Sequence, residues 1–87
     1  MINIEIYTKK NCPYCDRAKK LLIKKSLNFT EISIDNLQLS NNIVKTMIER
    51  SNGRTTVPQI FINNKHIGGS DDLILLNDSG KLDILLK

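Results

Sequence analysis

The sequence predicts a small α/β protein in which a four-stranded mixed β-sheet is flanked by helices, in the order β-α-β-α-β-β-α. Three observations lead to this fold class. Apolar residues alternate in short runs, amphipathic segments separate the first of these runs, and a tight turn joins two later runs. A chain of 87 residues has room for one domain, residues 1–87, and not for two independent cores.

The first third of the chain predicts a strand, a helix and a second strand. Isoleucines recur at period two in a run that is typical of a strand: Ile2, Ile4 and Ile6. Pro13 suits the first turn of a helix, and an apolar stripe behind it predicts a helix from Pro13 to Lys25. Alternation returns in "NFTEISID". A helix between two strands is typical of a parallel pair with a right-handed crossover.

The remaining segments predict a helix, a hairpin and a C-terminal helix. An amphipathic pattern begins near Ser40 and stops before Gly53, a natural helix terminator. The runs "PQIFI" and "KHIGG" flank "NN", so they predict two strands joined by a turn. Ser70 and the two aspartates after it are residues that cap a helix and complement its N-terminus. The last segment, "KLDILLK", is expected to add a short closing helix.

Composition and charge exclude several functional classes. The net charge of +4 is mild, and it either serves solubility or attracts an anionic ligand. Nucleic acid is not expected as a partner, because no basic run is interleaved with aromatic residues. The N-terminus does not resemble a signal peptide, and the longest aliphatic run, residues 73–76, is too short for a membrane span. We therefore expect a cytoplasmic protein without membrane contact, and a monomer, because nothing resembles a large apolar interface.

The two cysteines, Cys12 and Cys15, can in principle hold a metal, close a structural disulfide or perform redox chemistry. A structural zinc site needs four nitrogen or sulfur ligands, and beyond the pair the chain offers only His66, so no metal site is expected. Permanent disulfides are rare in the cytosol. A Cys-x-x-Cys motif after a strand of a βαβ unit favours redox chemistry.

The expected position of Cys12 at a helix start explains this chemistry. The unpaired N–H groups of the first turn and the helix dipole favour the thiolate over the thiol. Cys15 lies one turn further on and can close a small ring with Cys12. A sulfur that is favoured as a thiolate leaves quickly when a second thiolate attacks its partner. We therefore expect Cys12 to be repeatedly linked to a small thiol and displaced from it. Lys9 and Lys10 either add positive potential or are simply solvated.

Together, the motifs "CPYC", "TVP" and "GGSDDL" resemble those of a glutaredoxin of the bacterial dithiol type, and the resemblance extends over essentially the whole chain. Thioredoxins typically carry Trp-Cys-Gly-Pro-Cys, whereas this chain has no Trp. The resemblance implies a thioredoxin-like fold, with Cys12 as the nucleophile and Cys15 as the resolving thiol. It also implies a glutathione site formed by Lys9, Tyr14, Thr56, Val57, Pro58, Gly69, Ser70, Asp71 and Asp72.

Each part of this implied site has a physical role. The proline of the TVP loop is expected to be cis, which would expose the Val57 backbone to the cysteine moiety of glutathione. The segment from Gly68 to Asp72 would take the γ-glutamyl carboxylate on backbone N–H groups and the α-ammonium on Asp72. Lys9 would meet the glycyl carboxylate, and Tyr14 would pack beside the ligand. A second basic group is usual. Asn52 looks like an extra residue before the TVP loop, so Lys45 and Arg54 both remain candidates for that role.

The implied activity is that of a glutathione-dependent thiol–disulfide oxidoreductase. Such an enzyme reduces glutathione mixed disulfides, small disulfides and protein disulfides without a tightly bound cofactor. Its expected partners are glutathione, glutathionylated or disulfide-bonded proteins and, indirectly, NADPH-dependent glutathione reductase. Two alternatives stay open: a dimer that holds an iron–sulfur cluster through Cys12 and glutathione, and reduction by a thioredoxin-type reductase.

Overall fold

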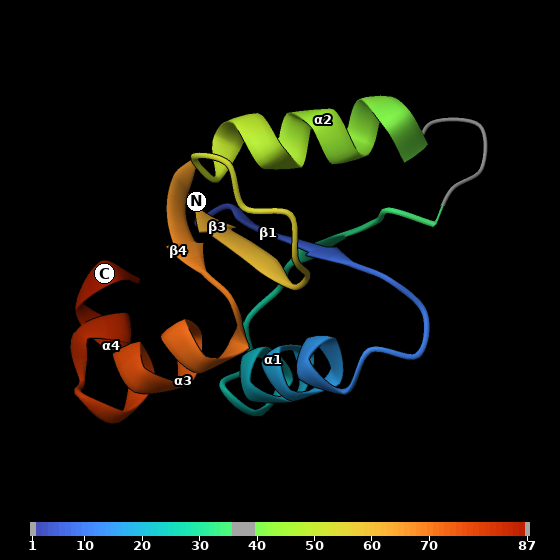
Figure 1. Ribbon diagram of the computed structural model, residues 1–87. Helices are drawn as coiled ribbons and strands as arrows, with labels where there is room; N and C mark the ends of the chain where they lie inside the picture. The colour runs from blue at the N-terminus through green and yellow to red at the C-terminus, as the bar shows by residue number, and fades with distance from the viewer. Residues whose placement is uncertain (1, 36–39, 87) are drawn as a thin grey trace.

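Four strands and four helices are present in residues 2–35 and 40–86, the part of the chain described by a computed structural model (Figure 1). In chain order they are β1 (Ile4–Thr8), α1 (Pro13–Lys24), β2 (Thr30–Ser33), α2 (Ser40–Arg50), β3 (Gln59–Ile62), β4 (Lys65–Gly68), α3 (Ser70–Asp78) and α4 (Lys81–Leu85). The predicted order is confirmed, with α4 as the closing helix. No helix in the described ranges has the length and apolar character needed to cross a membrane.

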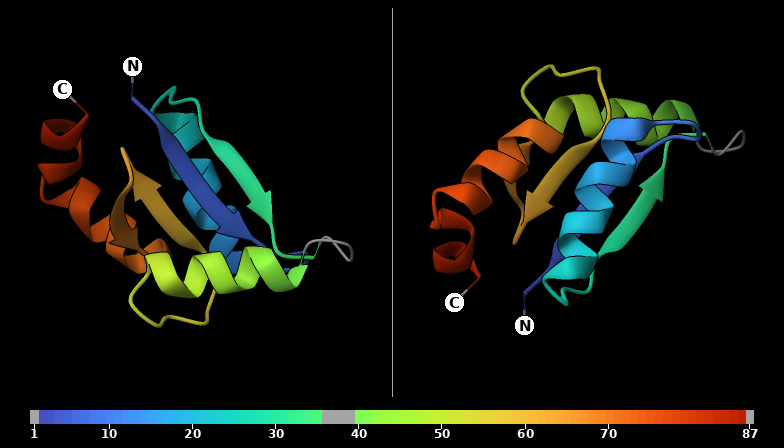
Figure 2. Two further views of the ribbon diagram at one scale, coloured as in Figure 1. Left: turned by 90° about the horizontal axis from the view of Figure 1, so that it is seen from above. Right: turned by 90° about the horizontal axis from the view of Figure 1, so that it is seen from below.

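The strands form one mixed sheet in the order β2-β1-β3-β4. β1 pairs with β2 in parallel, as the helical crossover predicted, and with β3 in antiparallel orientation. The register places Tyr7 opposite Gln59, so the end of β1 lies beside the beginning of β3. Seen from above in Figure 2, β1 runs through the middle of the molecule between β2 and β3.

Helices cover both faces of the sheet. α1, α3 and α4 lie on one side and α2 lies across the other (Figures 1 and 2). The core on the first side consists of aliphatic residues from both layers: Ile4, Ile6, Ala18, Leu22, Ile60, Ile62, Leu73 and Leu82. On the α2 side, Met47 packs against Tyr7 and Phe61. Successive side chains of β1 and β3 thus point into opposite cores, as the pleat of a strand requires.

The first strand is shorter than its isoleucine pattern predicted. β1 begins at Ile4, and Ile2 is 41% exposed. Asn3 instead pairs with the hairpin turn: its N–H donates to Asn63 Oδ1 at 2.9 Å, and its carbonyl accepts from the Asn63 N–H at 2.7 Å. The predicted turn at Asn63 and Asn64 is confirmed, and both residues have positive φ (50° and 67°).

Arg50 connects the C-terminal end of α2 to strand β1 through an ion pair and a hydrogen bond. Its guanidinium donates to Glu5 Oε1 at 2.8 Å and to Tyr7 Oη at 2.9 Å, and it lies 4.0 Å from the centre of the Phe61 ring. The hydrogen bond to Glu5 raises the pKa of Arg50 further above its usual range. Because Arg50 is the last residue of α2, these contacts set where the following loop begins.

Leu82 and Ile84 test whether α4 contributes to the core. Leu82 is completely buried, whereas Ile84 on the same short helix is 67% exposed. We expect Leu82→Ala to lower the free energy of unfolding by about 2–5 kcal/mol because it leaves a cavity. The exposed Ile84→Ala control should stay within about 0.5 kcal/mol of the parent. Urea unfolding followed by circular dichroism measures both; equal effects would show that α4 is not docked.

Candidate active site

Cys12 and Cys15 form a disulfide at the N-terminal end of α1. Cys12 is the N-cap residue, with an extended backbone, and its Sγ accepts a hydrogen bond from the Cys15 N–H at 3.2 Å. Pro13 is in the first turn, as predicted. Cys12 is 7% exposed and Cys15 only 1%, so Cys12 is the more exposed residue of the pair.

The Cys15 N–H group, which donates to Cys12 Sγ, also favours the reduced state of the pair that the chemistry requires. When the disulfide is reduced, a donor at the helix start and the positive end of the helix dipole favour negative charge on the Cys12 sulfur. The Cα atoms of the two cysteines are 5.2 Å apart, a usual separation for a disulfide. The pair is therefore placed to open and close without a large movement of the backbone.

The loop before β3 lies directly beside Cys12. The Val57–Pro58 peptide bond is cis, as the resemblance implied, and the Val57 carbonyl oxygen lies 4.0 Å from Cys12 Sγ. This closeness follows from the antiparallel pairing of β1 with β3, which brings the start of β3 next to the segment after β1. Thr56 to Pro58 and the cysteine pair therefore belong to one site.

Gln59 holds this loop in position, a role that sequence reasoning missed. Its side chain is completely buried, and Nε2 donates to the Thr56 carbonyl at 3.0 Å and lies 3.4 Å from Thr56 Oγ1. Gln59 Oε1 lies 2.7 Å from His66 Nε2 and can only accept, so His66 carries its proton on Nε2. Burial, and then the positive charge of Arg54, lower the pKa of His66, which is neutral at pH 7. A glutamine at the start of an otherwise apolar strand was the available signal.

At the start of α3, the Asp72 carboxylate packs closely against Gly68 and Gly69. Asp72 Oδ2 accepts a hydrogen bond from the Gly69 N–H at 2.9 Å. Gly68 has φ 124°, and a Cβ there would collide with the Asp72 carboxylate, so this close approach requires glycine. The Gly69 N–H, and to a lesser extent Arg54, keep the pKa of Asp72 below its usual range. The carboxylate is therefore charged at neutral pH.

The expected helix cap at Ser70 was wrong by one residue. Gly69 is the N-cap, with an extended backbone (φ −92°, ψ −165°), and Ser70 is the first helical residue. Asp72, the third helical residue, reaches back to accept the N–H of the cap, as the acidic residue of a capping box does. The Ser70 hydroxyl is buried and has no hydrogen-bond partner among the described residues.

A cavity of about 310 Å³ brings most of the expected site together. Its walls contain eight of the nine residues predicted to bind glutathione: Tyr14, Thr56, Val57, Pro58, Gly69, Ser70, Asp71 and Asp72. Gln59 and Arg54 complete the lining. The loop beside Cys12 and the start of α3 both line this cavity, so a ligand bound there could contact Asp72 and the loop next to the reactive sulfur.

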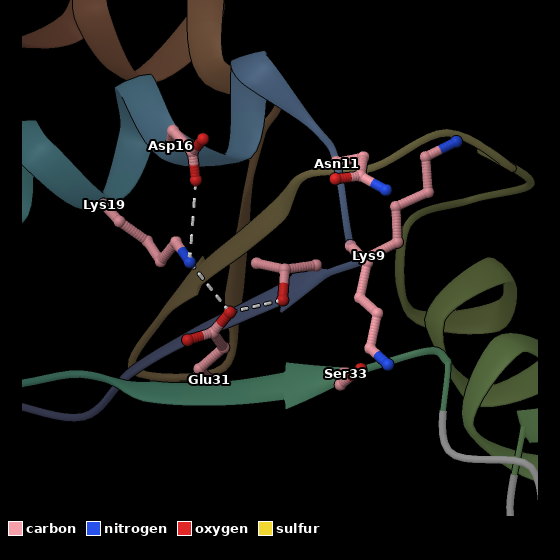
Figure 3. A pocket seen from close by; sticks show the side chains of 8 residues that line it. Lys9, Asn11, Asp16, Lys19, Glu31 and Ser33 are labelled. Carbon is pink, nitrogen blue, oxygen red and sulfur yellow. Dashed lines mark hydrogen bonds and ion pairs between the residues drawn. The ribbon is translucent and has the colours of Figure 1, made fainter.

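Lys9, the ninth predicted residue, lies in a second cavity of about 380 Å³ where β1, α1 and β2 meet (Figure 3). Among its lining residues, Glu31 Oε2 accepts from Thr8 Oγ1 at 2.6 Å and from Lys19 Nζ at 3.1 Å. These hydrogen bonds, that from Thr8 first, lower the pKa of Glu31. A contact between Lys9 and glutathione stays a prediction, because Lys9 does not line the cavity of Asp72.

The two candidates for a second basic group lie in different places. Lys45 lines a separate cavity along α2, together with Val44 and Ile48. Arg54 lines the cavity of Asp72 and is ion-paired with it: Nη1 lies 3.2 Å from Asp72 Oδ2. Of the two, Arg54 is therefore the one within reach of a ligand in this cavity. In the part of the chain that the structure describes, no three His, Cys, Asp or Glu residues are grouped so that they could hold a metal ion.

Comparisons with known proteins agree with this geometry. The model of the glutaredoxin family matches residues 4–67. Glutaredoxin 3 of Escherichia coli strain K12 is 57% identical over 89 aligned positions, which cover 100% of both chains. The solution structure of a glutaredoxin from Brucella melitensis has a TM-score of 0.82 at 49% identity and covers 100% of this chain and 90% of its own. A buckwheat glutaredoxin–glutathione complex has a TM-score of 0.87 at 32% identity, over 95% of this chain and 74% of that one.

The matched region contains the parts on which the chemistry depends. Residues 4–67 include both cysteines, the loop with the cis-proline and all four strands except Gly68, the last residue of β4. The fold is the thioredoxin-like fold of these relatives, with the redox-active cysteine pair at the start of its first helix. The chain therefore belongs to the glutaredoxin family of thiol–disulfide oxidoreductases.

Proposed function

We propose that this glutaredoxin uses glutathione as its reductant and acts on glutathione mixed disulfides, small disulfides and protein disulfides. The observation that carries the proposal is the cavity lined by Asp72 and by the Val57 loop, which lies beside Cys12. It combines the backbone of this loop with a charged carboxylate at the N-terminus of α3. A γ-glutamyl group carries an ammonium and a carboxylate, which match an acidic side chain and a helix N-terminus, respectively.

The reaction begins at Cys12. The Cys12 thiolate attacks the glutathione sulfur of a mixed disulfide, and the substrate protein leaves as a thiolate that takes up a proton. A second glutathione thiolate then attacks the glutathione sulfur on Cys12 and releases oxidised glutathione and the Cys12 thiolate. Two electrons pass from glutathione to the substrate disulfide. This route needs only Cys12, whose sulfur is a good leaving group because the helix start favours its anion.

Protein disulfides take a second route. Cys12 forms a mixed disulfide with one substrate sulfur, and the Cys15 thiolate attacks Cys12 Sγ, so that the substrate leaves as a dithiol. The product is the Cys12–Cys15 disulfide, the state present in the structure. Glutathione then reduces it in two successive exchanges, and glutathione reductase regenerates glutathione with NADPH. We propose that the protein works in this way as a monomer in the cytoplasm.

Replacing each cysteine should separate the two routes. Cys15→Ser is expected to retain activity on a small glutathione mixed disulfide but to lose the reduction of protein disulfides that require the dithiol. Cys12→Ser should abolish both activities, because it removes the attacking sulfur. Coupled assays with glutathione and glutathione reductase measure both. Equal loss of the two activities in Cys15→Ser would contradict the two-route scheme.

Gln59→Leu tests whether the buried amide positions the ligand loop. The variant removes the hydrogen bonds that hold Thr56. One neutral hydrogen bond contributes about 0.5–1.5 kcal/mol, so we expect the KM for a glutathione mixed disulfide to rise about two- to tenfold while kcat changes less. If the free energy of unfolding falls but KM does not change, Gln59 supports only the fold. Steady-state kinetics and urea unfolding distinguish these results.

A further inference from the structure

Arg54 forms an ion pair with the Asp72 carboxylate, the group that the proposed site offers to the ammonium of a ligand. Arg54 Nη1 donates to Asp72 Oδ2 at 3.2 Å, and the same oxygen accepts the Gly69 N–H at 2.9 Å. Arg54 and Asp72 come from different parts of the chain, the loop before β3 and the first turn of α3. Both line the cavity beside the cysteine pair. The guanidinium therefore lies where a positively charged end of a ligand would bind.

The backbone of Arg54 is hydrogen-bonded near the end of α2, whereas its side chain is half-exposed. The Arg54 carbonyl lies 3.2 Å from the hydroxyl of Ser51, a buried residue that follows α2. The side chains of Arg54 and Asp72 are 51% and 47% exposed, and the side-chain hydrogen bond of Arg54 in the described residues is the one to Asp72. Arg54 can therefore leave Asp72 for solvent without disturbing the loop that holds Thr56 and Val57.

We propose that Arg54 is a displaceable internal cation, which competes with the α-ammonium of glutathione for Asp72. This inference rests on the proposed use of glutathione. Asp72 carries one negative charge, and two cations within hydrogen-bond distance of its carboxylate repel each other. Binding of the ammonium therefore weakens the Arg54–Asp72 pair, and the pair returns when glutathione departs.

The competition has a consequence for turnover. Each catalytic cycle must release glutathione as well as bind it, and an internal cation that refills the site promotes release. Arg54 also reduces the advantage of a ligand that carries the α-ammonium over one that lacks it, because only the first has to displace the guanidinium. Arg54 thus tunes affinity and selectivity without touching the reacting sulfurs.

The test uses S-methylglutathione, which cannot form a disulfide, and the oxidised protein, in which the cysteine pair is closed. An exposed ion pair typically contributes about 0.2–1 kcal/mol, so Arg54→Gln should bind S-methylglutathione about 1.4- to fivefold more tightly than the parent. Lys65→Gln is the matched control. It removes the same charge from an exposed position at the far end of β4 and should leave the affinity unchanged. Isothermal calorimetry measures the three affinities, and thermal unfolding checks that each variant is folded.

A second ligand identifies the group that Arg54 opposes. The analogue of S-methylglutathione without the α-amino group should bind parent and Arg54→Gln with equal affinity, because it has no ammonium to place on Asp72. Equal or weaker binding of S-methylglutathione by Arg54→Gln would overturn the inference, as would a gain that persists with the analogue. If no variant binds S-methylglutathione and the parent shows no glutathione-dependent turnover, the proposed function fails together with the inference.

Discussion

The antiparallel pairing of β1 with β3 determines where every part of the site lies. β1 ends at Thr8 and leads into the cysteine segment, and the register places the first residue of β3 opposite the end of β1. The loop with the cis-proline therefore reaches Cys12, although 45 residues separate Val57 from it in the sequence. After the hairpin, β4 runs back along β3 with Gly68 opposite Ile60, so α3 starts near the beginning of β3, at the end of the sheet where the cysteine segment lies. Three segments distant in sequence converge there.

The N-termini of α1 and α3, at this end of the sheet, have complementary electrostatic roles. The start of α1 directs the Cys15 N–H at the Cys12 sulfur, which favours negative charge on a group that must attack and leave. The start of α3 holds the Asp72 carboxylate close to Gly68 and against the Gly69 N–H, which favours a fixed negative charge at the N-terminus of that helix. One helix start thus serves the reacting sulfur. The other suits the zwitterionic end of a ligand, which is why Arg54 can compete there.

Much of this arrangement could be predicted from local patterns, and the remainder depends on contacts between distant residues. Period-two isoleucines, the proline after Cys12 and the Asn-Asn turn are local signals, and each corresponds to the element that it predicted, although β1 begins at Ile4 and not at Ile2. The cap at Gly69 in place of Ser70 depends on the backbone angles of a single residue, which composition does not specify. The Gln59–Thr56 hydrogen bonds and the Arg54–Asp72 ion pair appear only when β3, β4 and α3 are packed together. For that reason the sequence alone could not decide between Lys45 and Arg54 as the second basic group, or predict the pairing of Arg54 with Asp72.

The proposed catalytic cycle requires glutathione to bind in the cavity lined by the Val57 loop and Asp72. The decisive measurement is the structure of the Cys15→Ser protein with glutathione in a disulfide with Cys12. We expect the glutathione cysteine to lie along the Val57 backbone and the γ-glutamyl group to reach the start of α3, with its ammonium at Asp72. Glutathione lying in the cavity of Lys19 and Glu31, or extending into solvent without contacting Val57 or Asp72, would show that this cavity is not the glutathione site.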